Sequence, residues 1–139
     1  MQIISKIEIN NAFKELNFKK NSSFVVHSSL MHLGLIKGVK IKQMPSEIFL
    51  LLRKNLGKNA TICVPSSNWD YSYKKKSFDK NKSNSHKEFG ALSSYIAKKP
   101  NSLRSNNPLF NISAIGKKAK YITDGGTSNA FGTDSAWDK

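Results

Sequence analysis

Cysteine is almost absent from this 139-residue chain, and the single one is Cys63. One thiol excludes a disulfide scaffold and a cysteine-based zinc site. Long apolar runs are missing as well: residues 48–52 form one of the longest, which is far too short to span a bilayer. The first ten residues, MQIISKIEIN, lack the continuous apolar stretch of a secretory signal. We therefore expect one small domain in a reducing, cytoplasmic setting.

Acidic residues are also scarce: there are 9 of them against 23 basic residues, which gives a formal net charge of +14. Such a surplus is typical of nucleic-acid-binding domains. However, only Arg53 and Arg104 are arginine, the side chain that reads guanine edges and stacks on bases. The densest lysine cluster is interleaved with serine and asparagine, as in a polar loop (Lys74, Lys75, Lys76, Lys80, Lys82 and Lys87). Nucleic-acid binding is therefore not favoured as the main role, whereas the charge suits anionic small molecules such as phosphorylated cofactors.

Hydrophobic periodicity predicts an α/β fold. Residues 24–26 form a β-branched and aromatic run, as expected of a buried strand. Residues 44–56 show helical spacing of apolar positions, with Pro45 in the first turn and Gly57 at the end. Residues 60–65 predict a second buried strand, in which Cys63 is a core residue rather than a reactive thiol. A strand, a helix and a strand at this spacing predict a βαβ unit with parallel strands.

The remaining segments are predicted from turn formers and shorter apolar patterns. No internal repeat or domain linker is evident. We expect a helix over 8–17, a loop over 31–40, a long polar loop over 66–88, a helix over 90–98, a chain of turns over 98–116 and a short helix over 117–122.

Two kinds of catalytic site find no support in the sequence. The histidines lack metal-ligating spacing (His27, His32 and His86), and no G-x-S-x-G elbow surrounds a serine. Ser28 and Ser29 instead follow the first predicted strand directly, at the position where α/β folds bind ligands. Exposed backbone N–H groups in residues 27–34, aided by these hydroxyls, can hold a pyrophosphate. A turn in which the serines act only as caps fits the same pattern equally well.

Six segments resemble, in the correct order, motifs of the aminoglycoside 3-N-acetyltransferase family. Each motif alone is modest, but the ordered set is specific, and the similarity spans about residues 5–139. The segments are VVHSSLMHLGLIKG (25–38), GKNATICVPS (57–66), FD (78–79), FGALSSYI (89–96), RSNNPLFNISAIGKKA (104–119) and FGTDSAW (131–137).

Four positions depart from the family pattern. Asn107 stands where the family has a histidine, and Asn111 stands where it commonly has a serine. Asn59 replaces a usual glycine, and Ala136 replaces a proline. These departures bear on the identity of the acceptor more than on the fold.

The resemblance implies an α/β fold with a parallel or mixed sheet and flanking helices. It implies acetyl-CoA as the donor, whose thioester is attacked directly by an amine of an aminoglycoside or amino sugar. By position, residues from the end of the first strand would line the coenzyme A cleft (His27, Ser28, Ser29, Leu30 and Gly34). Arg104 and Ser105 match the family's Arg-Ser motif and would serve a cofactor or structural role near the same cleft.

Several of these residues also have structural interpretations. Arg104 could form a salt bridge that orders a loop. His27 could act as a base, but a histidine at a strand end more often bonds a neighbouring carbonyl. Asp70 and Asp79 could attract a cationic amine, or they could be solvated surface groups.

The resemblance also implies that part of the domain is missing. The family's general-base histidine and its partner carboxylate lie in and beyond an Asn-Thr-x-x-His segment that these 139 residues do not contain. We therefore expect residues 1–139 to be the N-terminal part of a single acetyltransferase-like domain that lacks its catalytic half, and we assign no catalytic residue and no metal ligand. The alternatives are a non-catalytic basic binding module and a remnant fragment that folds only with a complementary chain.

Overall fold

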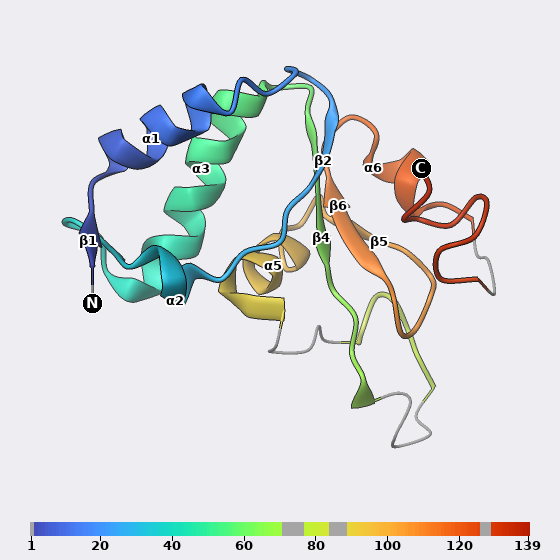
Figure 1. Cartoon of the computed structure of the whole chain (residues 1–139). Coiled ribbons are helices and arrows are strands. Elements are labelled where there is room, and N and C mark those ends of the chain that lie inside the picture. Colours follow the sequence, from blue (N-terminus) through green and yellow to red (C-terminus); the bar gives the residue numbers. More distant parts are fainter. Residues whose placement is uncertain (1, 71–76, 84–88, 126–128) are drawn as a thin grey trace.

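A four-stranded mixed sheet lies at the centre of the molecule. The structure is a computed structural model of the whole chain, and it describes residues 2–70, 77–83, 89–125 and 129–139. The strand order is β2-β4-β6-β5, in which β2 and β4 are parallel and the other neighbours are antiparallel. Helices cover both faces of the sheet (Figure 1), so the predicted α/β class with a mixed sheet is confirmed. The strands are β2 (Ser23–Val25), β4 (Thr61–Pro65), β5 (Leu103–Arg104) and β6 (Ile112–Ile115).

The predicted βαβ unit is present. Helix α3 (Met44–Leu56) connects β2 to β4, and Val25 pairs with Cys63 in parallel register. Pro45 lies in the first turn of the helix, where its missing N–H has no intrahelical partner to lose. Gly57 ends the helix at φ +96°, a conformation that favours glycine. Arg53 then ties the helix end to the sheet, because its guanidinium donates to the carbonyl oxygens of Ala60 (2.7 Å) and Ile115 (3.1 Å).

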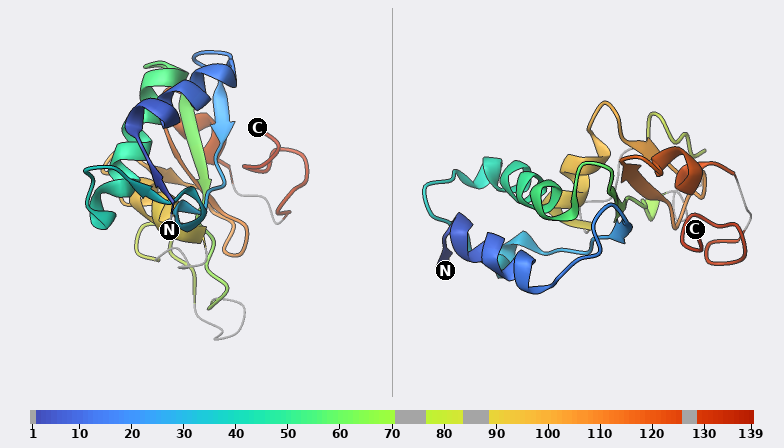
Figure 2. Two further views of the ribbon diagram at one scale, coloured as in Figure 1. Left: turned by 60° about the vertical axis from the view of Figure 1, so that its left-hand side comes forward. Right: turned by 90° about the horizontal axis from the view of Figure 1, so that it is seen from above.

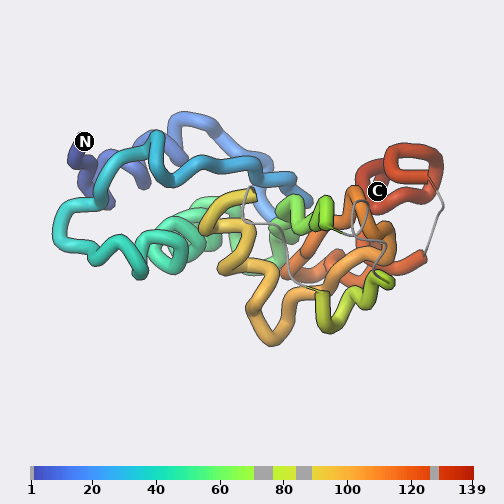
Figure 3. Tube along the Cα trace, turned by 90° about the horizontal axis from the view of Figure 1, so that it is seen from below, coloured from blue at the N-terminus to red at the C-terminus, as the bar shows by residue number. Residues whose placement is uncertain are grey.

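Alternate residues of β4 face two different cores. Ile62 and Val64 pack in the larger core with α3 and α5 (Gly90–Ala97), and α1 (Lys6–Glu15) covers α3. Cys63 faces the smaller core beneath α6 (Ala119–Thr123). Figure 2 shows α1 and α3 on one side of the sheet and α6 on the other, and Figure 3 shows the two termini at opposite ends of the molecule. Among the described residues, no helix combines the length and apolarity that crossing a membrane requires.

The chain of turns predicted over 98–116 is wrong in part. Strands β5 and β6 lie within it and form a hairpin, with Arg104 opposite Ser113. All four residues of β6 are buried, because the strand also pairs with β4 and lies between two cores. The proline, asparagine and serine residues that predicted turns lie in the segments before β5 (100–102) and between the two strands (105–111).

The loop predicted over 31–40 is also partly wrong. Helix α2 (Leu30–Leu33) and strand β3 (Leu35–Ile36) occupy it, and β3 pairs in parallel with β1 (Ile3–Ile4). Gly34 joins them at φ +90°. A Cβ at this position would overlap the backbone of Gln2, lying 3.0 Å from its carbonyl carbon, so the close approach requires glycine. A short 3₁₀ helix (Ile41–Gln43) then leads into α3.

The predicted burial of the first strand needs correction. Strand β2 is at one edge of the sheet, and its Val25 side chain is 51% exposed. Only Phe24 of this strand packs against the larger core. The apolar run is typical of a buried strand, but at the edge of the sheet one side of its backbone has no neighbouring strand among the described residues.

Candidate functional site

The pairing of β2 with β4 stops after Val26, and Pro65 explains why. The amide of Val26 still donates to the carbonyl oxygen of Cys63 at 2.8 Å, as the parallel ladder requires. The next bond of that ladder would be donated by residue 65, but proline has no N–H. The chain after Val26 therefore leaves the sheet at its carboxyl edge, which is the edge where α/β folds bind ligands.

A recess of about 360 Å³ lies at this edge, lined by His27, Ser28, Ser29, Pro65 and Phe89. The backbone amides of its first three residues donate to no acceptor among the described residues. Gly90 adjoins the recess at φ +84°, where a Cβ would lie 3.1 Å from the carbonyl oxygen of Ser28. Three predicted site residues thus line one recess, and their amides have no acceptor in the described part of the chain.

The two serines do not act as the caps that the alternative interpretation required. Ser29 is the N-cap residue of α2, yet its hydroxyl bonds the His32 ring nitrogen Nδ1 at 2.7 Å and caps no backbone amide. The hydroxyl of Ser28 is buried and has no hydrogen-bond partner in the described part of the chain. A buried hydroxyl without a partner costs free energy, so the Ser28 hydroxyl is a candidate donor to a bound ligand.

A chain of aromatic contacts begins and ends at the recess. The Phe89 ring lies 6.0 Å from Trp69, which lies 5.4 Å from Phe110. Phe110 continues to Phe131 at 5.0 Å, and Phe131 continues to Trp137 at 5.8 Å. The Trp137 ring then lies 6.1 Å from His27. The sequence did not predict this chain of aromatic contacts, because its residues come from four distant segments and have no common spacing.

Leu30 and Gly34 lie outside the recess. Leu30 begins α2 and packs against the larger core, and Gly34 is buried against Gln2. Both residues help to hold α2 in place, and α2 begins directly after Ser29, the last of the three residues whose amides have no acceptor among the described residues. The structure therefore gives these two predicted cleft residues supporting positions.

Arg104 occupies a different polar cluster. Its guanidinium donates to the Asn111 side-chain oxygen at 2.6 Å and to the carbonyl oxygens of Ser66 and Ser83, and it stacks 5.2 Å from the Phe78 ring. These contacts to neutral oxygens tie Arg104 to the loop after β4, which is consistent with the loop-ordering role of the structural interpretation. The cluster approaches the recess through Ser66, the neighbour of Pro65.

Ser105 and Asn111 hold the hairpin under Arg104. Ser105 is buried; its hydroxyl accepts from the Ile112 amide at 3.0 Å, and its own amide donates to the Ile112 carbonyl at 3.0 Å. The Asn111 side chain is fully buried and accepts from the Ser66 hydroxyl at 2.8 Å. The sequence had marked Asn111 only as a departure from a family serine, and its central place depends on contacts made 45 residues away.

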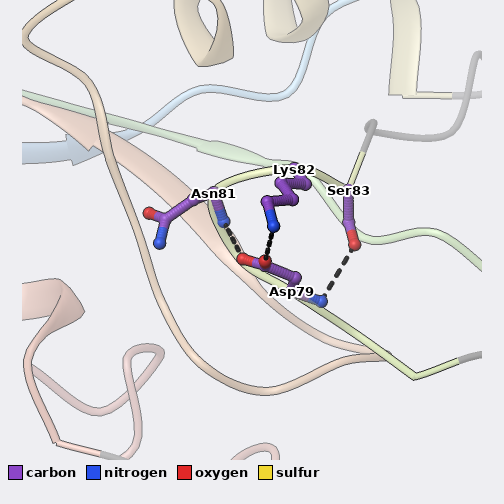
Figure 4. A network of polar contacts seen from close by, with 4 residues as sticks. All are labelled: Asp79, Asn81, Lys82 and Ser83. Carbon is purple, nitrogen blue, oxygen red and sulfur yellow. Dashed lines mark hydrogen bonds and ion pairs between the residues drawn. The ribbon is translucent and has the colours of Figure 1, made fainter.

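Asp79 organises a turn beside Arg104 (Figure 4). One carboxylate oxygen accepts from the Asn81 amide at 2.9 Å, and the other lies 3.7 Å from the Lys82 ammonium. The Ser83 hydroxyl accepts from the Asp79 amide at 3.0 Å. The carboxylate therefore has a local structural role, which supports the surface interpretation of this residue.

No cluster suited to a metal ion occurs among the described residues. His86 and Lys74, Lys75, Lys76 and Lys87 lie outside them. Cys63 is buried in the smaller core, and burial raises the pKa of its thiol to about 11. The prediction that Cys63 is an unreactive core residue is confirmed as to its position.

Comparison with known proteins adds a family to this geometry. The aminoglycoside 3-N-acetyltransferase profile matches residues 25–139. No curated protein matches the sequence significantly.

Solved acetyltransferase structures share the fold. AAC-IIIb in a binary complex with CoASH superimposes with a TM-score of 0.80 at 18% identity, covering 99% of this chain and 55% of that one. Aminoglycoside acetyltransferase AAC(3)-Xa gives 0.81 at 18% identity, with 98% and 52% covered. Sisomicin-bound AAC-VIa gives 0.78 at 19% identity, with 97% and 55% covered. This chain thus spans about half the length of these structures, and it belongs to the aminoglycoside 3-N-acetyltransferase family.

Proposed function

We propose that this chain is the N-terminal, coenzyme-A-binding part of a single-domain, cytoplasmic N-acetyltransferase that uses acetyl-CoA. One observation carries the proposal: the backbone amides of three consecutive residues that line a recess at the carboxyl edge of two parallel strands, His27, Ser28 and Ser29, have no acceptor among the described residues. Family membership supports the choice of ligand, as does the relative that was solved with CoASH.

The residues present fit a coenzyme A diphosphate. Backbone N–H groups that follow a strand hold phosphate oxygens without a charged side chain. The buried Ser28 hydroxyl is a further donor, and it has no partner among the described residues. Phe89 and Pro65 give the recess an apolar side, which limits water near the bound group. When bound, acetyl-CoA supplies a thioester whose acetyl group is open to attack by an amine.

The acceptor in this proposal is an amine of an aminoglycoside or amino sugar. The sisomicin-bound relative supports that chemical class. His27 is the only recess residue that could take a proton from the amine, and its ring is exposed beside Trp137. The Asn-Thr-x-x-His segment that the family resemblance assigns to the general base is absent from these residues. We therefore predict that this chain binds coenzyme A and does not turn over acetyl-CoA by itself.

Titration calorimetry of the chain with coenzyme A tests the proposal through Ser28→Ala. Loss of one donor to a phosphate should weaken binding about three- to tenfold. Ser93→Ala is the matched control: its hydroxyl, in α5, is also buried without a partner in the described residues, but it does not line the recess.

Two results would count against the proposal. One is equal affinity of the two variants for coenzyme A. The other is unchanged hydrogen exchange at the amides of residues 27–29 when the wild-type chain is saturated with coenzyme A. A chain without any cooperative melt would instead support the remnant that needs a complementary polypeptide.

A further inference from the structure

A second and larger concavity lies along the outer edge of β5. Strands β2 and β5 are at opposite ends of the sheet order, so this groove is separate from the recess. Its volume is about 820 Å³, within the usual range for small-molecule sites. Its walls come from β5, from the C-terminal ends of α5 and α6, and from the turn at residues 80–83. We call it the β5 groove.

The β5 groove is strongly cationic. Asp124 is the one carboxylate among its lining residues, against five cations (Lys80, Lys82, Lys98, Arg104 and Lys120). Lys80, Lys98 and Lys120 pair with no carboxylate in the described part of the chain. Two helices end here, and their terminal carbonyls contribute at most about one negative charge in total. The Asp79 carboxylate, 3.7 Å from the Lys82 ammonium, is a further negative charge beside the groove. The five cations still outnumber all of these negative charges, so the groove has a net positive potential.

Hydroxyl groups give the groove neutral donors as well. Ser94, Ser102 and Thr123 all line it. Thr123 donates within its helix, to the carbonyl oxygen of Ala119 at 2.9 Å. The Ser102 hydroxyl, by contrast, is buried and has no partner in the described residues. An orphaned hydroxyl among unpaired ammonium groups is a suitable donor for an anionic oxygen.

One wall of the groove is fixed before any ligand binds. Arg104 bonds the Ser83 carbonyl, and Asp79 closes the turn that carries Lys80 and Lys82, as Figure 4 shows. The Lys82 and Ser83 amides both donate to the Asp79 carbonyl oxygen. Such preorganisation lowers the entropic cost of ordering side chains around a ligand.

We propose that the β5 groove binds a small, multiply charged phosphate-bearing molecule. Ala97 and Leu103 are the apolar residues of the lining, and the cations around them favour an anionic ligand over a hydrophobic one. Two or more phosphate groups match the spread of cations over four segments of the chain better than a single carboxylate does. The proposal does not depend on acetyl transfer, since the groove and the recess share no lining residue.

Inorganic triphosphate is the probe for this site, titrated calorimetrically into the full 139-residue chain at physiological salt. The double variant Lys98→Gln, Lys120→Gln should bind it about tenfold more weakly, because two charge-assisted contacts are lost. The control Lys19→Gln, Lys20→Gln removes the same charge from exposed positions outside the groove and should change the affinity less than twofold.

A hydroxyl variant keeps the test independent of net charge. Ser102→Ala should weaken triphosphate binding about threefold, whereas Ser135→Ala, which removes another partnerless buried hydroxyl, should not. Coenzyme A affinity should stay unchanged in all the groove variants, so failure here and failure of the proposed function are distinguishable.

Three outcomes would overturn the proposal. Equal weakening by the two lysine pairs would show attraction by overall charge alone. Absence of triphosphate binding at physiological salt would remove the site. Tight binding of single-stranded RNA that the groove variants abolish, without triphosphate binding, would assign the groove to a nucleic acid instead.

Discussion

At the scale of single residues, Arg104 joins three segments that are remote in the sequence. It reaches Ser66 after β4, Ser83 in the loop turn and Asn111 before β6. A planar guanidinium can donate in these directions at once, whereas a lysine ammonium is a point donor on a flexible stem. The Arg-Ser motif and the Phe-Asp motif therefore meet in space, since Phe78 stacks on the same guanidinium.

We predict that Arg104→Lys destabilises the chain by about 1–3 kcal/mol and loosens the 79–83 turn specifically. Hydrogen exchange of the Lys82 and Ser83 amides should accelerate, because both bond the Asp79 carbonyl within that turn. Arg53→Lys is the control, since that guanidinium also bonds two carbonyls but lies at the end of α3. Equal acceleration in both variants would show that global stability, rather than Arg104, holds the turn.

These contacts also show why the sequence predicted only part of the site. Ser28 and Ser29 were found because they directly follow an apolar strand, which is a local signal. Arg104 came from a motif, but its partners lie up to 38 residues away and follow no spacing rule. Phe89, Phe110 and Trp137 reach the recess region only through the tertiary fold. Local patterns therefore locate the ends of strands, but they do not indicate which distant side chains pack beside those ends.

At the scale of elements, the same division applies to the fold. Helix α3 was predicted because thirteen residues carry its periodicity and both of its ends have typical residues, Pro45 and Gly57. Strand β6 was missed because it has four residues between turn formers, and its pairing with β4 joins positions about fifty residues apart. Short strands have too few residues for periodicity to outweigh the neighbouring proline and asparagine.

At Gly116, directly after β6, the backbone passes very close to the start of β4. The φ of Gly116 is +139°, and a Cβ there would lie 2.7 Å from the Thr61 Cα and would overlap the Ala60 carbonyl. Because backbone cannot yield as a side chain can, Gly116→Ala should cost about 2–4 kcal/mol in urea unfolding. Gly38→Ala has φ +73° but open space around it, so it should cost only about 1 kcal/mol. If both substitutions lowered the free energy of unfolding equally, the positive φ and not the close backbone contact at Gly116 would explain the loss.

The start of α1 should make stability depend on pH. Ser5 and Glu8 form a capping box, and the side-chain hydrogen bond from Ser5, followed by its backbone bond, lowers the pKa of Glu8. Because this pKa is lower in the folded state than in the unfolded state, its stabilising effect is present above the unfolded pKa and is lost as pH falls through the folded one.

The melting temperature of the wild-type chain should therefore fall between pH 6 and pH 3, and Glu8→Gln should make this fall smaller. Ser5→Ala should reduce the fall by the same amount. The double variant should reduce it no more than either single one, since both substitutions act on one contact. Additive effects of the two substitutions would contradict this account.

At the scale of the whole molecule, the sheet is open at β2, and this edge should govern self-association. Val25 is half exposed on a strand whose outer side has no neighbour among the described residues. Such an edge is a template for pairing with another chain. The net charge of +14 opposes that pairing, so association should appear only when salt screens the repulsion, at about 1 M where the Debye length is about 3 Å.

We predict that sedimentation equilibrium at high salt shows reversible oligomers of the wild-type chain and that Val25→Lys shifts them to monomer. Lysine at an edge strand places a charge where a second strand would dock, and desolvating it is unfavourable. Leu50→Lys is the control: Leu50 is 60% exposed, but it lies on α3, which offers no free backbone groups for pairing. Equal loss of oligomers in both variants would assign the association to apolar surface in general, and a monomeric wild-type chain at high salt would show that the β2 edge does not pair.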